Sequence, residues 1–259
     1  MRFLLTLIIN IAFFQTISFA QSDTINKTDN KGLRQGYWIK HQQNGNKAAE
    51  GYFIDGKQTG TFIHYQSDGT TLKARIEHQT NSDSSKASFY HENGVLMSEG
   101  LYINQKKEGS WKFYDNRNVL SSIEEYNNDK QHGKTIIYHF KGQIAREVNY
   151  NNGLAQGIFK EYAPNGNVLI EGKYLDGNYD GVIKFFYSNG MIKNQGMYKH
   201  AVKNGKWIYY DTDGKILVTE IYSNGNLVSR DMSDETKQRA LELQEERKEQ
   251  FMNEDNNNE

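Results

Sequence analysis

The sequence repeats with a period of about 24 residues, and such a period constrains the fold more than any other feature of the chain. In the clearest unit a start glycine, taken as position 0, is followed by an aromatic residue at +5 and Asn-Gly at +8 and +9. An aliphatic side chain at +11, a glycine at +15 and a tyrosine at +17 complete the unit. The start positions are Gly36, Gly60, Ser85, Gly109, Gly133, Gly157, Gly181, Gly205 and Ser229, and the step after Gly60 is longer by a single position. This pattern predicts a repeat array, in which each unit contacts only its neighbours.

Each unit is predicted to form a β-hairpin. Asn-Gly or Asp-Gly pairs separate two short runs rich in aromatic and β-branched residues, and these pairs supply the positive φ angles of tight hairpin turns. A second turn, as in Leu175-Asp176-Gly177, leads into the next unit. The prediction is an all-β fold: an elongated, single, twisted antiparallel sheet of about eight tandem 24-residue hairpins, followed by a C-terminal α-helix. In the irregular unit that starts at Gly60 we expect a loop or bulge near residues 80–84.

The N-terminus is typical of a secretory signal peptide. Arg2 precedes a mostly apolar run from Phe3 to Phe14, and Ser18 and Ala20 are small residues placed for cleavage. The run is shorter than the ~20 residues of a membrane-spanning helix. We expect cleavage after Ala20, a secreted or periplasmic location and no membrane span in the mature chain.

The remaining chain divides by composition. Residues 1–20 are the predicted signal peptide, 21–31 a flexible lead-in, 32–230 the hairpin array, 231–252 a helix and 253–259 a disordered tail. Ser233 followed by Asp234 and Glu235 predicts the helix start, since such residues cap and stabilise helix N-termini. From Arg230 to Glu259 there are 5 basic and 10 acidic residues, whereas the whole chain has 31 basic and 32 acidic ones. This balance gives no indication of a nucleic-acid partner.

Alternation along the strands suggests which side chains share a face. Pairing +5 with +11 across the Asn-Gly turn predicts one face that carries the side chains of positions +5, +11, +15 and +17 as a structural spine. The opposite face is then expected to carry the aromatic side chains of positions +2 and +4, beside a broken column of glutamates at +14. The members of this aromatic row are Trp38, Phe62, Trp111, Phe113, Phe159, Phe185, Trp207 and Tyr209.

The turn-and-glycine segments, as in residues 54–60 and 175–181, resemble the MORN repeat. More closely, the repeat unit is similar to the MORN-variant repeat of bacterial proteins labelled YwqK-like antitoxins, over roughly residues 32–228. The resemblance implies a non-enzymatic array of hairpins that serves as a binding surface, and it implies a toxin as one class of partner.

The sequence shows no catalytic or metal-binding constellation. His91 and His139 both occupy +6 but lie two units apart, about 20 Å, which is too far to share an ion. The +14 glutamates Glu147 and Glu171 would be about 10 Å apart, beyond the spacing of paired glycosidase carboxylates. The chain has no cysteine. We therefore expect no enzyme activity, no metal and no cofactor.

The aromatic row allows two interpretations. It forms either a second packed layer of a curled sheet or the lining of a groove for a partner. The leading hypothesis is an exported scaffold that binds an unidentified protein, such as an envelope protein or a toxin. An antitoxin or immunity protein is the alternative, and a carbohydrate-binding surface with stacking on Trp38, Trp111 or Trp207 is a third.

Overall fold

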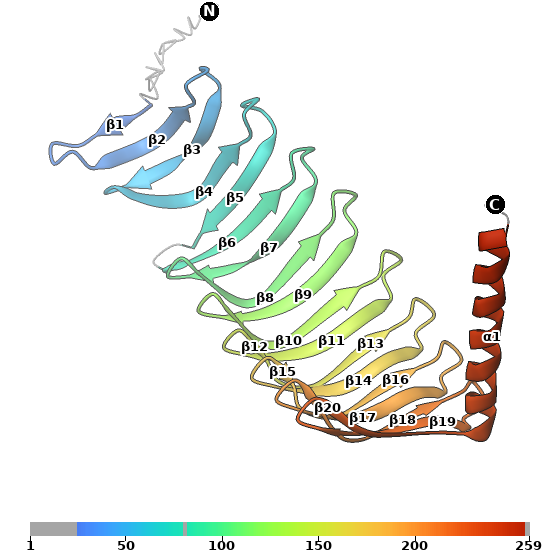
Figure 1. Cartoon of the computed structure of the whole chain (residues 1–259). Helices are drawn as coiled ribbons and strands as arrows, with labels where there is room; N and C mark the ends of the chain where they lie inside the picture. Colours follow the sequence, from blue (N-terminus) through green and yellow to red (C-terminus); the bar gives the residue numbers. More distant parts are fainter. Residues whose placement is uncertain (1–24, 80–81, 257–259) are drawn as a thin grey trace, which may run out of the picture.

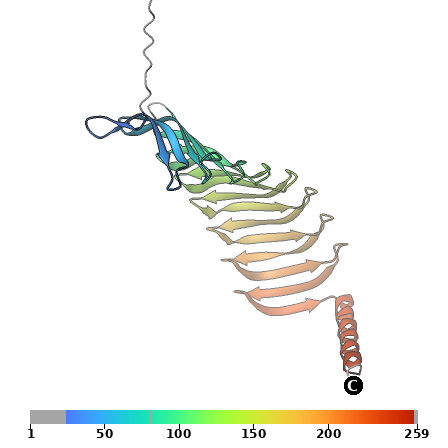
Figure 2. The same cartoon turned by 90° about the horizontal axis from the view of Figure 1, so that it is seen from above.

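The computed structural model describes residues 25–79 and 82–256 as one open antiparallel sheet of 20 strands followed by a single helix. Figure 1 shows the hairpins in sequence order along a curved array, and Figure 2 shows them as a ladder with α1 at its far end. The predicted fold is confirmed. The elements are β1 (Lys27–Thr28), β2 (Arg34–His41), β3 (Lys47–Ile54), β4 (Lys57–Tyr65), β5 (Leu72–His78), β6 (Ser84–Tyr90), β7 (Leu96–Ile103), β8 (Lys106–Tyr114), β9 (Leu120–Asn127), β10 (Lys130–Tyr138), β11 (Ile144–Asn151), β12 (Leu154–Ala155), β13 (Gly157–Tyr162), β14 (Val168–Leu175), β15 (Asn178–Tyr179), β16 (Gly181–Phe186), β17 (Ile192–Lys199), β18 (Val202–Tyr210), β19 (Ile216–Ser223), β20 (Asn226–Met232) and α1 (Asp234–Asn256).

Two kinds of turn alternate along the array. Between β13 and β14, the N–H of Gly166 donates to Ala163 O at 2.8 Å, and Gly166 has a φ of 88°. Between β14 and β15, Asp176 and Gly177 both have positive φ, 49° and 81°, which is the type I′ geometry favoured in two-residue hairpins. The predicted role of Asn-Gly and Asp-Gly pairs is thus confirmed for the glycines of both turns.

A β-bulge in the repeat unit changes the predicted faces. In the unit that starts at Gly157, Tyr162 pairs with Val168 and Glu161 pairs with Ile170, so one residue of β14 is left without a partner. The +5/+11 pairing is therefore confirmed, but the extra residue inverts the alternation beyond it. Phe159 pairs with Gly172, which places positions +2, +15 and +17 on one face. The predicted spine of +5, +11, +15 and +17 is wrong, because the bulge moves +5 to the other face.

The actual spine is a row of side chains at +2 that pack against those at +15 and +17. Its members at +2 are Trp38, Phe62, Ala87, Trp111, Thr135, Phe159, Ile183 and Trp207. Aromatic rings of neighbouring units contact one another edge to face, as do Tyr198 and Trp207 at a centroid distance of 5.2 Å. These contacts run between units, so the spine holds successive hairpins together.

The sizes of the spine residues are matched at five of the contacts between adjacent units. Phe62, Trp111 and Trp207 lie over the glycines at +15 of the preceding units, Gly51, Gly100 and Gly196. Where the side chain at +2 is small, the residue in place of the +15 glycine of the preceding unit is larger. Ala87 pairs with Ile76, and Thr135 pairs with Glu124. Close packing of this kind leaves room for one large side chain at each contact.

On the opposite face of the sheet, hydrogen bonds between side chains connect neighbouring units. Tyr114 donates to Glu99 at 3.0 Å, and Tyr162 donates to Glu147 at 2.7 Å. In each pair a +5 tyrosine reaches the +14 glutamate of the preceding unit. Burial and then the glutamate raise the pKa of Tyr162 to about 12. The glutamate column is therefore an inter-repeat link rather than a purely solvated stripe.

The ends of the array differ from the sequence-based boundaries. Part of the predicted lead-in forms β1, which pairs with β2. The helix α1 begins at Asp234, and Ser233 Oγ accepts a hydrogen bond from the Thr236 N–H at 3.2 Å, as predicted. It continues to Asn256 and so includes residues 253–256, which the sequence placed in a disordered tail. Residues 257–259 and the predicted signal peptide lie outside the described residues.

The irregular unit is more regular than expected where it is described. β5 and β6 pair without a register shift from Ala74↔Phe89 to His78↔Ser85. The extra residue lies instead in the turn between β4 and β5, where Tyr65 pairs with Leu72. Residues 80 and 81, in the middle of the predicted loop or bulge, are outside the described residues.

Candidate functional site

The predicted aromatic row divides into buried and half-buried residues. Phe62, Trp111, Phe159 and Trp207 are at most 6% exposed and form the spine itself. Trp38, Phe113, Phe185 and Tyr209 are half-buried. The four buried rings therefore belong to the packed spine, and Phe62 among them also lines an open hollow.

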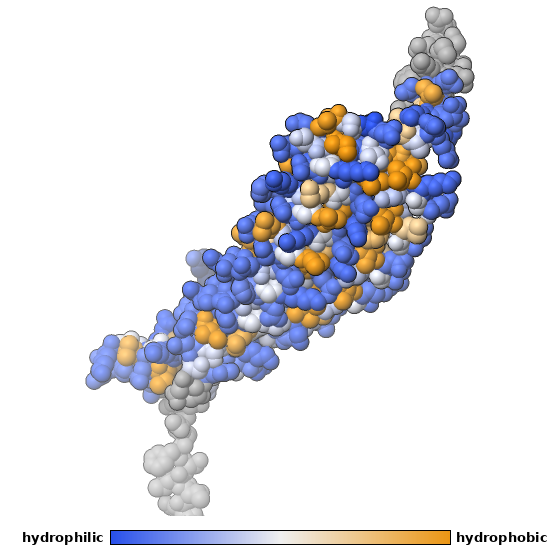
Figure 3. Space-filling view, turned by 90° about the horizontal axis from the view of Figure 1, so that it is seen from below, coloured by the Kyte–Doolittle hydropathy of each residue, from blue (hydrophilic) through white to orange (hydrophobic). Residues whose placement is uncertain are grey.

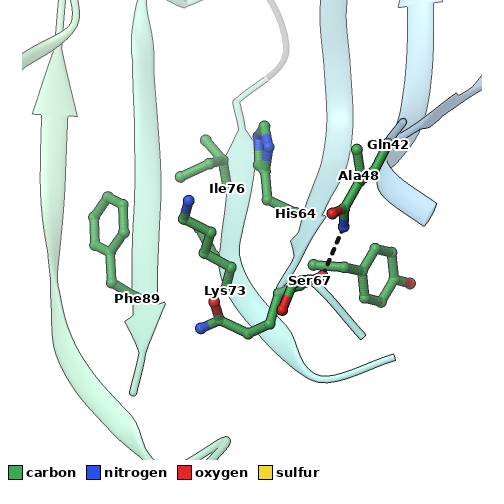
Figure 4. A pocket seen from close by; sticks show the side chains of 10 residues that line it. Gln42, Ala48, His64, Ser67, Lys73, Ile76 and Phe89 are labelled. Atoms are coloured by element: carbon green, nitrogen blue, oxygen red, sulfur yellow. Dashed lines mark hydrogen bonds between the residues drawn. The ribbon is translucent and has the colours of Figure 1, made fainter. Parts of the chain in front are cut away.

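An open groove does exist, at the N-terminal end of the same face. We call it the N-terminal groove, and it consists of two hollows of about 600 and 460 Å³ that share Ala48 and His64. Its lining residues are Arg34, Trp38, Ile39, Lys40, Gln42, Ala48, Ala49, Phe53, Gln58, Phe62, His64, Tyr65, Gln66, Ser67, Lys73, Ala74, Ile76 and Phe89. Figure 4 shows the larger hollow, with Lys73 between His64 and Phe89.

Small side chains in two successive units contribute to this groove. Ala49, at +13, and its counterpart Ala74 are buried, and each lies opposite a larger side chain of the neighbouring strand: Ala49 pairs with His64, and Ala74 pairs with Phe89. From the unit that starts at Gly133 onward, the side chain at +13 is larger, beginning with Arg146. The two units between have Ser98 and Ser122 at +13, which are small as well, so the alanines contribute to the hollow at the N-terminal end without being its sole cause.

The N-terminal groove is electropositive. Arg34, Lys40 and Lys73 are exposed at its rim, and none of the described residues that line it is Asp or Glu. Neither lysine forms a salt bridge within the described parts of the chain. The Arg34 guanidinium lies 4.9 Å from the centroid of Trp38, so its charge stays beside an aromatic surface.

His64 lies at the centre of the groove, where it lines both hollows. Burial, and then the charges of Lys73 and Lys40, lower the pKa of the His64 imidazole below its ordinary value. The ring is therefore neutral at neutral pH and becomes an additional positive charge in acid.

Another hollow of about 600 Å³, separate from the N-terminal groove, lies at the C-terminal end of the array beside the start of α1. Three of its four charged residues, Glu220, Arg230 and Lys203, make polar contacts close by. Glu220 is 4% exposed and accepts from Arg230 Nη2 at 2.5 Å and from Tyr222 at 2.8 Å. Lys203 donates to Tyr209 at 2.8 Å and lies 4.4 Å from the Trp207 ring centroid. Lys193 in this hollow is exposed and forms no salt bridge within the described residues, but the hollow also contains the acidic Glu220, whereas the described lining of the N-terminal groove has no acid. The N-terminal groove is therefore the better candidate site for an acidic partner.

A constellation that was not identified in the sequence occurs twice in the structure. Lys107 lies over Trp111 and Tyr126 beside Glu124, and Lys203 lies over Trp207 and Tyr222 beside Glu220. Every member of the second set follows its counterpart by four repeat units. The sequence signal that could have revealed this constellation is the identical spacing of Lys, Trp, Glu and Tyr in the two sets. Both lysines are engaged with rings, so they stabilise the spine through cation–π contacts.

The histidines at +6 have a structural role. His91 Nε2 lies 3.0 Å from Tyr114 O, and His139 Nε2 lies 2.8 Å from Tyr162 O. Each imidazole therefore donates to the backbone of the next unit. Among residues 25–79 and 82–256, no group of three or more His, Cys, Asp or Glu is arranged to hold a metal ion.

The surface of the array is mixed in polarity. Figure 3 shows one long face of the array, on which apolar patches are separated by hydrophilic ones. Within the described part of the chain, no helix has the length and apolar character needed to cross a membrane.

Comparisons with known proteins agree with the repeat architecture. Five segments match the family described as "MORN repeat variant": residues 86–104, 131–152, 155–176, 179–200 and 203–224. No curated protein matches the chain.

Two solved structures show a limited likeness. The crystal structure of TarM is 16% identical over 45% of this chain and 20% of that one, with a TM-score of 0.22. A mutant of S. aureus TarM in complex with Fondaparinux, alpha-GlcNAc-glycerol and UDP is 16% identical over 44% and 19%, also with a TM-score of 0.22. This chain therefore spans about a fifth of the length of either structure.

Proposed function

We propose that this chain, which five family matches support as a MORN-repeat protein, is an exported, non-enzymatic scaffold that binds another protein in the N-terminal groove. The observation that carries the proposal is the groove itself. It combines exposed cations that have no described salt-bridge partner with an apolar, partly aromatic floor.

Protein is the class of partner that this surface favours. Interface centres are enriched in aromatic residues and arginine, and Trp38 with Arg34 is such a combination. The hollows adjoin one another across β2 to β6, so an extended or helical segment can lie across several strands. The partner's segment is expected to carry acidic residues that face Lys40 and Lys73.

The test is a pull-down from an envelope extract with the mature chain as bait. The wild type should retain a partner that the variant K40Q/K73Q loses. The matched control K206Q/K215Q removes the same charge from two lysines that are exposed and outside the groove. A partner retained equally by all three proteins would place the binding surface elsewhere, and no partner under any growth condition would contradict the proposed function.

Export is tested separately. We propose that the signal segment is removed after Ala20, so the mature protein should begin at Gln21. Mass spectrometry of the protein from a periplasmic or secreted fraction measures this terminus. A full-length chain confined to the cytoplasm would contradict export without affecting the groove.

The alternative partner is a toxin, as the resemblance to YwqK-like antitoxins implies. In that case a neighbouring gene should encode a product that is lethal when this chain is absent and harmless when it is present. Carbohydrate stacking is less favourable, because Trp111 and Trp207 are buried and only Trp38 is half-exposed among the three tryptophans. A sugar that changes the Trp38 fluorescence would support that third function.

A further inference from the structure

We propose that the N-terminal groove of one copy binds the acidic helix α1 of a second copy, so that the arrays associate head to tail. The proposal rests on the proposed function and deepens it by naming one occupant of the same groove. It also implies that self-association and binding of a foreign partner compete.

The helix has the charge and the position that such an occupant needs. It carries 8 acidic and 4 basic residues, as its sequence DETKQRALELQEERKEQFMNEDN shows. Asp234, Glu235 and Glu245 are exposed, and so are the apolar side chains of Leu241 and Leu243, at 55% and 44%. Figures 1 and 2 show α1 projecting from the end of the array, so most of its length is free of the sheet.

The groove complements both features of the helix. Lys40 and Lys73 supply positive charge without described salt-bridge partners, and the floor around Phe62 supplies apolar surface. Leu241 is the side chain whose exposure such a floor would relieve, and it shares one face of the helix with the acidic Asp234 and Glu245. Burying Leu241 gives affinity, while the charges select the acidic helix and speed the encounter.

The helix α1 of one copy cannot reach the N-terminal groove of that same copy. The groove spans β2 to β6 and α1 follows β20, so about five hairpins separate them, or about 50 Å at hairpin spacing. A helix of 23 residues is only about 35 Å long. The two contacting surfaces are different, so the association is heterologous and adds copies at both ends instead of closing a symmetric dimer.

The experiment uses full mature chains and sedimentation velocity. The wild type should show a mass that increases with concentration at low ionic strength and falls toward that of a monomer at high salt, because exposed charges are screened. The groove variant K40Q/K73Q and the helix variant E235Q/E242Q/E245Q should each self-associate with an affinity roughly tenfold lower than that of the wild type. This is the loss expected when several exposed charge contacts are removed.

Mixing the two variants gives the decisive result. The groove variant keeps a wild-type helix and the helix variant keeps a wild-type groove, so the mixture should form heterodimers that do not grow further. K206Q/K215Q should behave as the wild type, and circular dichroism melting should show that all variants are folded.

Three results would overturn the inference: a wild type that stays monomeric at low salt, an association that neither variant weakens, or a mixture without heterodimers. A monomeric wild type whose groove variant still loses a partner in the pull-down would leave the proposed function intact and reject only the self-association.

Discussion

Trp207 lies directly over Gly196, and a Cβ at residue 196 would overlap the indole ring. The indole N–H donates to Met197 O at 3.2 Å, which fixes the ring against β17. Trp111 lies over Gly100 in the same way and donates to Leu101 O at 3.1 Å. The glycine at +15 is therefore a packing requirement beneath the indole rings of Trp111 and Trp207.

The first prediction tests this packing. Gly196→Ala should destabilise the array by about 2 kcal/mol, since extra volume in a packed core forces the ring to move. The same change in a Trp207→Val background should cost almost nothing, because the space is then free. A double-mutant cycle from denaturant unfolding measures the coupling, and additive effects would contradict the size-matching rule.

The second prediction concerns turns that lack glycine. His200 and Ala201 have φ values of 50° and 67°, and the equivalent pair Asn224-Gly225 has a glycine at the second position. A non-glycine residue in this region costs about 1 kcal/mol, so Ala201→Gly should raise the stability by about that amount. Gly225→Ala is the matched control and should have the opposite sign. The midpoints of thermal unfolding measure both changes.

The third prediction concerns the charge buried at the C-terminal end. Burial raises the pKa of Glu220, but hydrogen bonds from Arg230, Tyr222 and Tyr209 outweigh it, so the pKa lies below its ordinary value. Arg230→Ala removes the main partner of a carboxylate whose side chain is 5% exposed, so it should lower the midpoint of thermal unfolding. The double variant E220L/R230A should recover most of this loss, because no buried charge remains.

The Glu220–Arg230 pair also affects how the stability of the protein falls at low pH. A carboxyl group with a lowered folded pKa stabilises the protein above its unfolded pKa, and this contribution is lost as the pH falls through the folded pKa. In R230A the folded pKa of Glu220 should rise toward its unfolded value, so the acid-dependent loss of stability should be smaller and should be complete at a higher pH than in the wild type. Unfolding curves measured across the acid range test the shift.

The fourth prediction concerns His64. Its folded pKa is lowered, so the unfolded chain binds the proton more tightly, and stability should fall as the pH decreases below the ordinary histidine value of 6.5. His64→Gln should reduce this slope, and His132→Gln, at an exposed position, should retain it. Unfolding free energies at neutral and mildly acidic pH measure the two slopes. Equal slopes in wild type and His64→Gln would contradict the assignment.

Much of the architecture could be predicted because its causes are local. The turn glycines have positive φ whatever the rest of the chain does, as Gly166 and Gly177 show. The start of α1 at Asp234 follows from the capping side chain of Ser233. Each of these features depends on a few consecutive residues, so a single sequence reports it.

The candidate site was less predictable because one inserted residue per hairpin decides the faces. The bulge opposite Tyr162 leaves the +5/+11 pairing intact but reverses the side on which Gly172 and Tyr174 lie. The sequence has no separate signal for such an insertion, because a hairpin with the bulge and a hairpin without it can have the same turn residues. The predicted binding row consequently contains spine residues such as Trp111.

The sequence alone determined the repeat unit, its two turns, the antiparallel array and the acidic helix at its end. Only the tertiary structure decided which rings are buried and where an open groove remains. The physical reason is that burial depends on contacts between neighbouring units: Trp207 is covered because Gly196 of the preceding unit leaves room for it, whereas Ala49 and Ala74 contribute to the hollow beside Lys40 and Lys73.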